Sequence, residues 1–158
     1  MRQEMMSASV GDDVYGEDPT INKLEEFAAH LLKKECGLYL PSGTQSNLAA
    51  LLTHCQRGDE YIVGQDAHTY RFEGGGAAVL GSIQPQPIHF EPNGTLSIDQ
   101  ITSVIKPLDS HFARSRLVCL ENTQAGKALD LAYIQQVKDL CNKHKLNLHL
   151  DGARFFNA

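Results

Sequence analysis

The chain has 158 residues, of which 42% are hydrophobic and 21% are charged, and its formal net charge is −5 at pH 7. This length suits one domain with a sizeable buried core. The negative charge, with no stripe of Lys and Arg, argues against nucleic acid as a partner, and no apolar run approaches the roughly 20 residues that a membrane span needs.

The cysteines and the N-terminal residues indicate a reducing compartment. The opening "MRQEMMSASV" lacks the apolar centre of a secretory signal. The four cysteines form no C-x-x-C pair, and the seven histidines form no H-x-x-x-H pair. We therefore expect free thiols, no metal site and a cytoplasmic or organelle-matrix protein, of which the cytoplasm is our choice.

The first predicted helix begins at Asp18, which can act as the N-cap, with Pro19 in the first turn. Gly37 is expected to end this helix, and Leu38 to Leu40 to form a short strand. The apolar residues of the helix fall on one face: Ile21, Leu24, Phe27, Ala28, Leu31 and Leu32.

The middle of the chain reads as alternating helix and strand. A second helix is predicted from Thr44 to Cys55, followed by a buried strand "EYIVG" (60–64). The polar, glycine-rich segment "QDAHTYRFEGGG" (65–76) comes next, and "AAVLGS" (77–82) is interpreted as another strand. The proline-containing "QPQPI" (84–88) is expected to be extended.

The last third continues the same alternation. Ser97 can cap a short helix, "RLVCLEN" (116–122) reads as a strand, Asp130 to Lys143 as a helix, and "LNLHLD" (146–151) as the final strand. Alternating strands and helices predict an α/β fold, with a mainly parallel sheet and helices on both faces.

Several polar residues follow predicted strands, where ligands of such sheets bind. They are Ser42 to Thr44, His68, Glu121 to Thr123 and Asp151. Their expected convergence predicts a site for a small molecule.

The segment "LPSGTQSN" places Gly43 and Thr44 between the predicted strand and the start of the second helix. Exposed amides and the helix dipole would form an anion site there. The alternative is a simple capping turn, in which Gly43 permits the bend and Thr44 caps the helix. The pattern is not a P-loop.

Asp151 follows an apolar strand, so its charge needs a cation or hydrogen-bond donors. One candidate is Arg154, three residues later. The other is a cationic ligand, and the protonated pyridine nitrogen of pyridoxal phosphate fits, because an acidic partner keeps that nitrogen protonated. His68 could be a structural histidine, or it could cover a cofactor ring or move a proton.

Five segments together resemble the low-specificity L-threonine aldolases, which are pyridoxal-phosphate enzymes of fold type I. They are "VGDDVYGEDPT", "LPSGTQSNLAAL", "GQDAHTYRFEGGGAAVLGSIQPQPI", "HFARSRLVCLENTQAGKAL" and "HLDGARFFNA". The resemblance implies cleavage of L-threonine or L-allo-threonine to glycine and acetaldehyde by a homodimer or homotetramer. A related β-eliminating lyase is an alternative reaction on the same fold.

The resemblance also implies residue roles. Gly43 and Thr44 would bind the cofactor phosphate, His68 would stack on the ring and act as the base, and Asp151 would bind the ring nitrogen. Arg154 would contact the ring oxygen and the substrate carboxylate. His111 would contact the substrate hydroxyl as a catalytic residue, and Tyr15 would bind substrate near a subunit boundary.

The resemblance further implies that residues 1–158 are part of a large, cofactor-binding domain. Members of the family carry an earlier D-L-R-S-D-T-like segment, a later Ser-Lys pair whose lysine forms the Schiff base, and a small C-terminal domain. We expect this chain alone to be inactive. The alternative is a non-catalytic short form that binds a phosphate ligand or intact subunits. Lys127 is interpreted as a peripheral residue.

Overall fold

The computed structural model describes all residues of the chain, Met1–Ala158, and consists of two compact units, Met1–Pro41 and Ser42–Ala158. The first unit contains helix α1 (Arg2–Ser7), a 3-10 turn (Asp13–Tyr15) and helix α2 (Pro19–Leu32). As predicted, Asp18 caps α2, because its Oδ1 accepts from the amides of Thr20 and Ile21 at 2.9 Å. The hydrogen bonds from the backbone amides of Ile21, Gly11 and Thr20 lower the pKa of Asp18.

Two sequence-based expectations for this unit are wrong. Helix α2 ends at Leu32 and not at Gly37, because Lys33 adopts the left-handed conformation (φ 51°) and closes the last turn onto the carbonyls of Ala29 and His30. Leu38 to Leu40 form no strand. The amide of Tyr39 donates to Glu25 Oε1 at 2.6 Å, so a side chain takes the place of a neighbouring strand.

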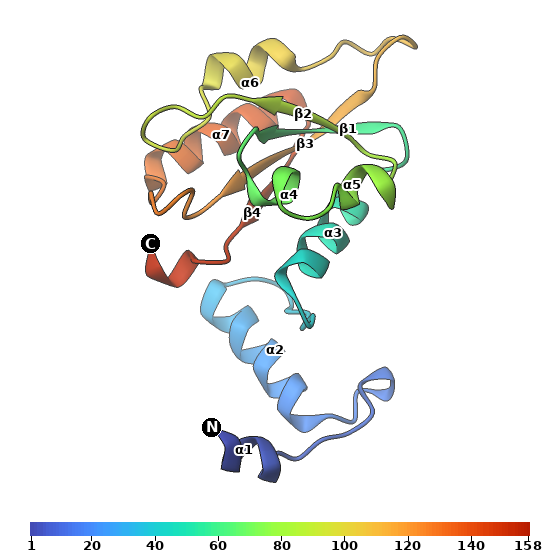
Figure 1. Cartoon of the computed structure of the whole chain (residues 1–158), viewed down its shortest axis with the longest axis vertical. Coiled ribbons are helices and arrows are strands. Elements are labelled where there is room, and N and C mark those ends of the chain that lie inside the picture. The colour runs from blue at the N-terminus through green and yellow to red at the C-terminus, as the bar shows by residue number, and fades with distance from the viewer. The chain divides into compact units, whose positions relative to one another are not determined.

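The second unit is built on four parallel strands: β1 (Asp59–Gly64), β2 (Gln84–Ile88), β3 (Arg114–Glu121) and β4 (Asn147–Asp151). They lie in the order β2-β1-β3-β4, which confirms the predicted parallel sheet (Figure 1). Strand β2 tolerates Pro85 and Pro87 because it is an edge strand, where a missing N–H costs little.

The helices of this unit are α3 (Gly43–His54), α4 (His68–Arg71), α5 (Gly76–Val79), α6 (Ile98–Val104) and α7 (Leu131–His144), with a final 3-10 turn (Phe155–Asn157). Ser97 caps α6, as predicted, and Asp130, which the sequence placed inside the helix, is the N-cap of α7. No helix combines the length and the apolar character required for crossing a bilayer.

The segment 77–82 was expected to be a strand but contributes to α5. A short apolar run does not by itself distinguish a helix from a buried strand. Here Gly75 adopts the left-handed conformation and starts the turn, and the amides of Val79 and Leu80 donate to the carbonyls of Gly75 and Gly76 at 2.9 Å. The backbone amides of this segment therefore find acceptors within the helical turn and need no neighbouring strand.

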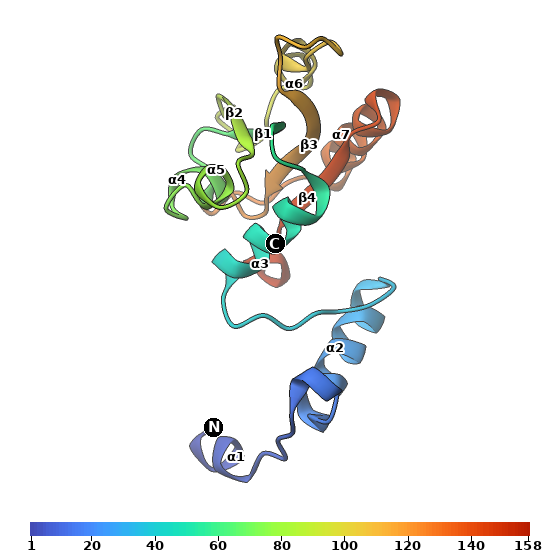
Figure 2. The ribbon, with the colours of Figure 1, turned by 90° about the vertical axis from the view of Figure 1, so that its right-hand side faces the viewer.

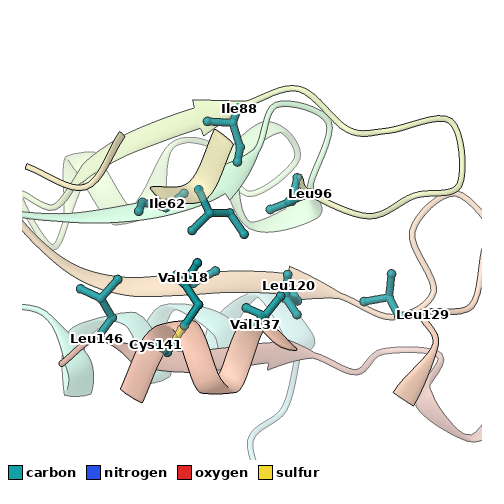
Figure 3. Close-up of a cluster of buried hydrophobic side chains, with 11 residues drawn as sticks. Ile62, Ile88, Leu96, Val118, Leu120, Leu129, Val137, Cys141 and Leu146 are labelled. Carbon is teal, nitrogen blue, oxygen red and sulfur yellow. The ribbon is translucent and has the colours of Figure 1, made fainter. Parts of the chain in front are cut away.

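Helices cover both faces of the sheet, as predicted (Figure 2). Each face has its own cluster of buried hydrophobic side chains. Ile62 and Val118 point to one face, where they pack with α7 residues such as Val137 (Figure 3). Ile101 of α6 belongs to the same cluster. The alternate strand residues point to the other face and pack with Leu51 of α3 and Ala77 of α5. The sheet is thereby held rigidly on both sides.

The strand order reverses direction between β1 and β3. The chain leaves β1 to form β2 on one side and then crosses to form β3 on the other side of β1. The connections that follow β1 and β3 therefore diverge at the carboxyl edge of the sheet, which is where ligands bind in open α/β folds.

Candidate active site

A cavity of about 210 Å³ lies at this carboxyl edge. It is lined by Gly43, Asn47, His68, Glu121, Asp151, Ala153 and Arg154. Four of the residues that the sequence proposes as cofactor contacts are thus brought together, from the start of α3, from the segment after β1 and from the end of β4. Thr44 is the next residue after Gly43 in the same exposed turn.

The turn before α3 presents free backbone donors. Ser42, and not Thr44 as the capping alternative supposed, is the N-cap, since its Oγ accepts from the Gln45 amide at 3.2 Å. The amides of Gly43 and Thr44 have no acceptor in the protein. A Cβ added at Gly43 would meet nothing within 4 Å. The first turn of a 12-residue helix therefore offers open amides to an anion.

Asp151 ends β4 and is 7% exposed. Its Oδ2 accepts from Asn47 Nδ2 at 2.8 Å and its Oδ1 from the Ala153 amide at 3.1 Å. Arg154 forms no ion pair with Asp151, so the interpretation of Arg154 as its cation is not realised. A carboxylate held by neutral donors at a cavity wall suits a cationic ligand group.

His68 connects the ends of two strands. Its amide donates to Glu121 Oε2 at 2.9 Å, and its ring Nδ1 lies 2.8 Å from Oε1 of Glu73, whose side chain is only 4% exposed. Because the carboxylate accepts, the neutral ring carries its proton on Nδ1. Nε2 is then left as an acceptor, which is the state that a base requires.

The carboxyl group of Glu121 is a weaker acid than a free glutamate side chain. Burial raises the pKa of Glu121, and the hydrogen bond from the His68 amide offsets part of this rise. At the cavity wall, Glu121 therefore binds a proton more tightly than a free carboxyl group does.

Three polar residues of the site were missed by sequence reasoning. Asn47 lies one turn after Gly43 on the same face of α3, a spacing that could have revealed it. Glu73 and His149 carried no comparable signal, because only the folded chain brings them close to Asn47. Glu73 Oε1 lies 2.8 Å from Asn47 Nδ2, and His149 Nε2 lies 3.0 Å from Asn47 Oδ1.

A larger cavity of about 710 Å³ adjoins the first and shares His68, Glu121 and Arg154 with it. Phe72 and Phe90 supply apolar walls, and Lys127, which the sequence placed at the periphery, also lines it. This arrangement leaves room beside His68 for a second molecule or a larger ligand.

His111 is not part of this cavity. His111 is exposed, pairs with Asp109 at 2.6 Å and precedes the amino end of β3. The eight residues of β3 span roughly 23 Å, so His111 lies at the sheet edge opposite to the cavity. Tyr15 belongs to the Met1–Pro41 unit, and its substrate role stays a prediction.

Comparison with known proteins gives consistent matches. A model of the beta-eliminating lyase family matches residues 1–158. The low specificity L-threonine aldolase of Escherichia coli K12 is 58% identical over 158 residues, which cover all of this chain and 47% of that protein. Low-specificity L-threonine aldolase 1 of Arabidopsis thaliana is 42% identical over 164 residues, covering all of this chain and 46% of that protein.

Among solved structures, the Leishmania major threonine aldolase matches with a TM-score of 0.81 and 26% identity, over 98% of this chain and 45% of that one. The chain therefore spans about half the length of the curated relatives that it matches. The α/β fold is that of the pyridoxal-phosphate enzymes of fold type I, as predicted. Since the family model matches every residue, the chain belongs to the beta-eliminating lyase family.

Proposed function

We propose that this sequence belongs to a pyridoxal 5'-phosphate-dependent aldolase that cleaves L-threonine or L-allo-threonine to glycine and acetaldehyde. One observation carries the proposal: open amides at Gly43, the ring of His68 and the buried carboxylate of Asp151 surround a single cavity. The relatives named as threonine aldolases support the choice of reaction.

The residues of the cavity fit the proposed cofactor. The unpaired amides of Gly43 and Thr44 suit a phosphate, and Asp151 suits a protonated ring nitrogen. His68 offers its ring as a flat surface. When bound, the cofactor supplies an electron sink for the pair released from the substrate's Cα–Cβ bond.

His68 is the proposed base. Glu73 fixes its ring proton on Nδ1, so that Nε2 can accept the proton of the substrate's β-hydroxyl group, directly or through a water. Loss of this proton turns the hydroxyl carbon into the carbonyl of acetaldehyde as the Cα–Cβ bond breaks. The guanidinium of Arg154, which lines both cavities, is proposed to bind the substrate carboxylate and to contact the ring oxygen.

A homodimer or homotetramer is proposed as the working assembly. Within one chain, His111 lies at the sheet edge opposite to the cavity. If His111 contacts the substrate hydroxyl, a second copy of the chain must supply it. Tyr15 is proposed to bind substrate near the same subunit boundary.

Residues 1–158 are proposed to form part of the large domain of the enzyme, with the lysine that binds the cofactor covalently outside them. Covalent catalysis requires such a lysine, and none of the lysines in the chain lines the cavity that contains Asp151. The four free cysteines support a reducing compartment, which we propose is the cytoplasm.

The reaction test separates the aldolase from a β-eliminating lyase, the alternative that the family description favours. The full enzyme is incubated with L-threonine, and the products are quantified by mass spectrometry. The proposal predicts glycine and acetaldehyde in equal amounts. Ammonia and 2-oxobutyrate, the products of β-elimination, would assign the lyase activity instead.

A further inference from the structure

We infer that Asn47 and His149 form a positioning pair, which holds the carboxylates of Glu73 and Asp151 in place and thereby orients His68 and the proposed ring-nitrogen contact together. The hydrogen bonds of the pair join residues of this chain alone. Only the effect of the pair on the cofactor rests on the proposed function.

Asn47 is the centre of a hydrogen-bonded network. Its Nδ2 lies 2.8 Å from Glu73 Oε1 and 2.8 Å from Asp151 Oδ2, and its Oδ1 lies 3.0 Å from His149 Nε2. An amide nitrogen has two protons, and each carboxylate takes one of them. Asn47 itself is 6% exposed, so every polar atom of its side chain is satisfied without water.

His149 fixes the orientation of this amide. If the amide were rotated by half a turn, its oxygen would face two carboxylate oxygens with no proton between them. Burial lowers the pKa of His149, so its ring is neutral at pH 7, although Asp151 and Glu73 oppose this effect and His54 adds to it. The neutral ring must therefore carry its proton on Nε2 in order to donate to Asn47 Oδ1.

The pair offsets a repulsion between like charges. The nearest ligand atoms of His68, Glu73 and Asp151 all lie within 4.8 Å of one another. Two carboxylates at this separation repel, and the bridging amide protons reduce that repulsion without adding charge.

The network links the two proposed chemical roles. Glu73 Oε1 accepts from both Asn47 and the His68 ring, whereas Asp151 Oδ2 accepts from Asn47. A displacement of the Asn47 amide would therefore move both Glu73, which holds the His68 ring, and Asp151, the proposed contact of the ring nitrogen. We therefore assign Asn47 and His149 as positioning residues, neither of which contacts substrate.

The first test measures ring tautomers in the full chain without cofactor. Two-bond 1H–15N correlation spectra at pH 7.5 report which ring nitrogen carries the proton. We expect His149 to be protonated on Nε2 and His68 on Nδ1, the opposite tautomers. Protonation of His149 on Nδ1 would overturn the inference, whatever the protein's reaction.

The second test measures the dissociation constant of pyridoxal phosphate by fluorescence titration. Asn47→Leu and His149→Phe should each raise it about tenfold, while His149→Gln, whose Nε2 can still donate to Asn47, should stay within about threefold of the wild type. His89→Gln, at an exposed histidine with no hydrogen-bond partner, is the matched control.

The two tests separate the possible failures. If the wild-type chain does not bind pyridoxal phosphate, that result contradicts the proposed function. The positioning role is then decided by the tautomers of His68 and His149 alone. If the wild type binds and His149→Phe binds equally well with the His68 tautomer unchanged, the positioning role is wrong. If Asn47→Leu does not fold, the dissociation constants of His149→Phe and His149→Gln still test the positioning role.

Discussion

Glu121 shows how the position of one side chain sets its chemistry. It ends β3 at the cavity wall, where burial raises its pKa above the ordinary value of 4.5. The folded chain therefore holds a proton on this group more tightly than the unfolded chain does. The resulting stabilisation is fully present below pH 4.5 and is lost as the pH rises through the folded pKa.

Glu121→Gln should therefore stabilise the chain at pH 7 and have little effect near pH 4. Glutamine retains an oxygen that can accept from the His68 amide, while the charge that burial disfavours is removed. Urea unfolding at both pH values checks this difference. Equal effects of the substitution at pH 4 and pH 7 would mean that Glu121 titrates normally.

At the scale of elements, strand β1 carries a buried ion pair on the sheet. Glu60 is fully buried and lies 3.1 Å from Lys106 Nζ, which also donates to Gln86 Oε1 at 2.7 Å. Ser115 of β3 donates to Glu60 Oε1 at 2.9 Å. The pair thus connects three neighbouring strands with the end of α6.

Lys106→Met should destabilise the chain by about 3–5 kcal/mol, because it leaves the Glu60 carboxylate buried without a cation. Glu60→Gln should cost less, since the lysine side chain is 22% exposed and can reach water. Urea unfolding at pH 7 measures both variants. A larger loss for Glu60→Gln than for Lys106→Met would contradict this account.

The carboxyl end of β1 depends on close packing at Gly64. A Cβ added there would overlap the ring of Phe90, a residue that also lines the larger cavity. Gly64→Ala should therefore cost about 1–3 kcal/mol. Gly43→Ala, which meets nothing within 4 Å, is the matched control and should be nearly neutral for stability.

A double-mutant cycle in urea unfolding identifies the cause. Phe90→Leu should recover part of the loss caused by Gly64→Ala, so that the two changes are not additive. Strict additivity would show that the alanine methyl group and the ring do not collide.

At the scale of the whole molecule, the sequence predicts the sheet well because β1, β3 and β4 are apolar runs with clear ends. It fails where a local pattern is ambiguous, as in α5, or where a side chain replaces a strand partner, as Glu25 does for Tyr39. His68 and Asp151 could be proposed because they follow strands. The contact of Asn47 with Asp151 could not, because the two residues are 104 positions apart.

The proposal that the covalent lysine lies outside residues 1–158 has a direct test. The chain is incubated with pyridoxal phosphate, reduced with borohydride and weighed by intact-mass spectrometry. We expect no lysine-linked adduct beyond that of a denatured control, because no lysine lines the cavity that contains Asp151. A stoichiometric adduct on a single lysine of the folded chain would overturn the proposal.

The most direct measurement of the central claim is the 15N chemical shift of the cofactor's ring nitrogen in the holoenzyme that contains this chain. If Asp151 keeps that nitrogen protonated, the wild type gives the shift of a pyridinium, and Asp151→Asn gives that of a neutral pyridine with most of the activity lost. A neutral ring in the wild type, or an unchanged shift with near-normal turnover in the variant, would contradict the role assigned to Asp151.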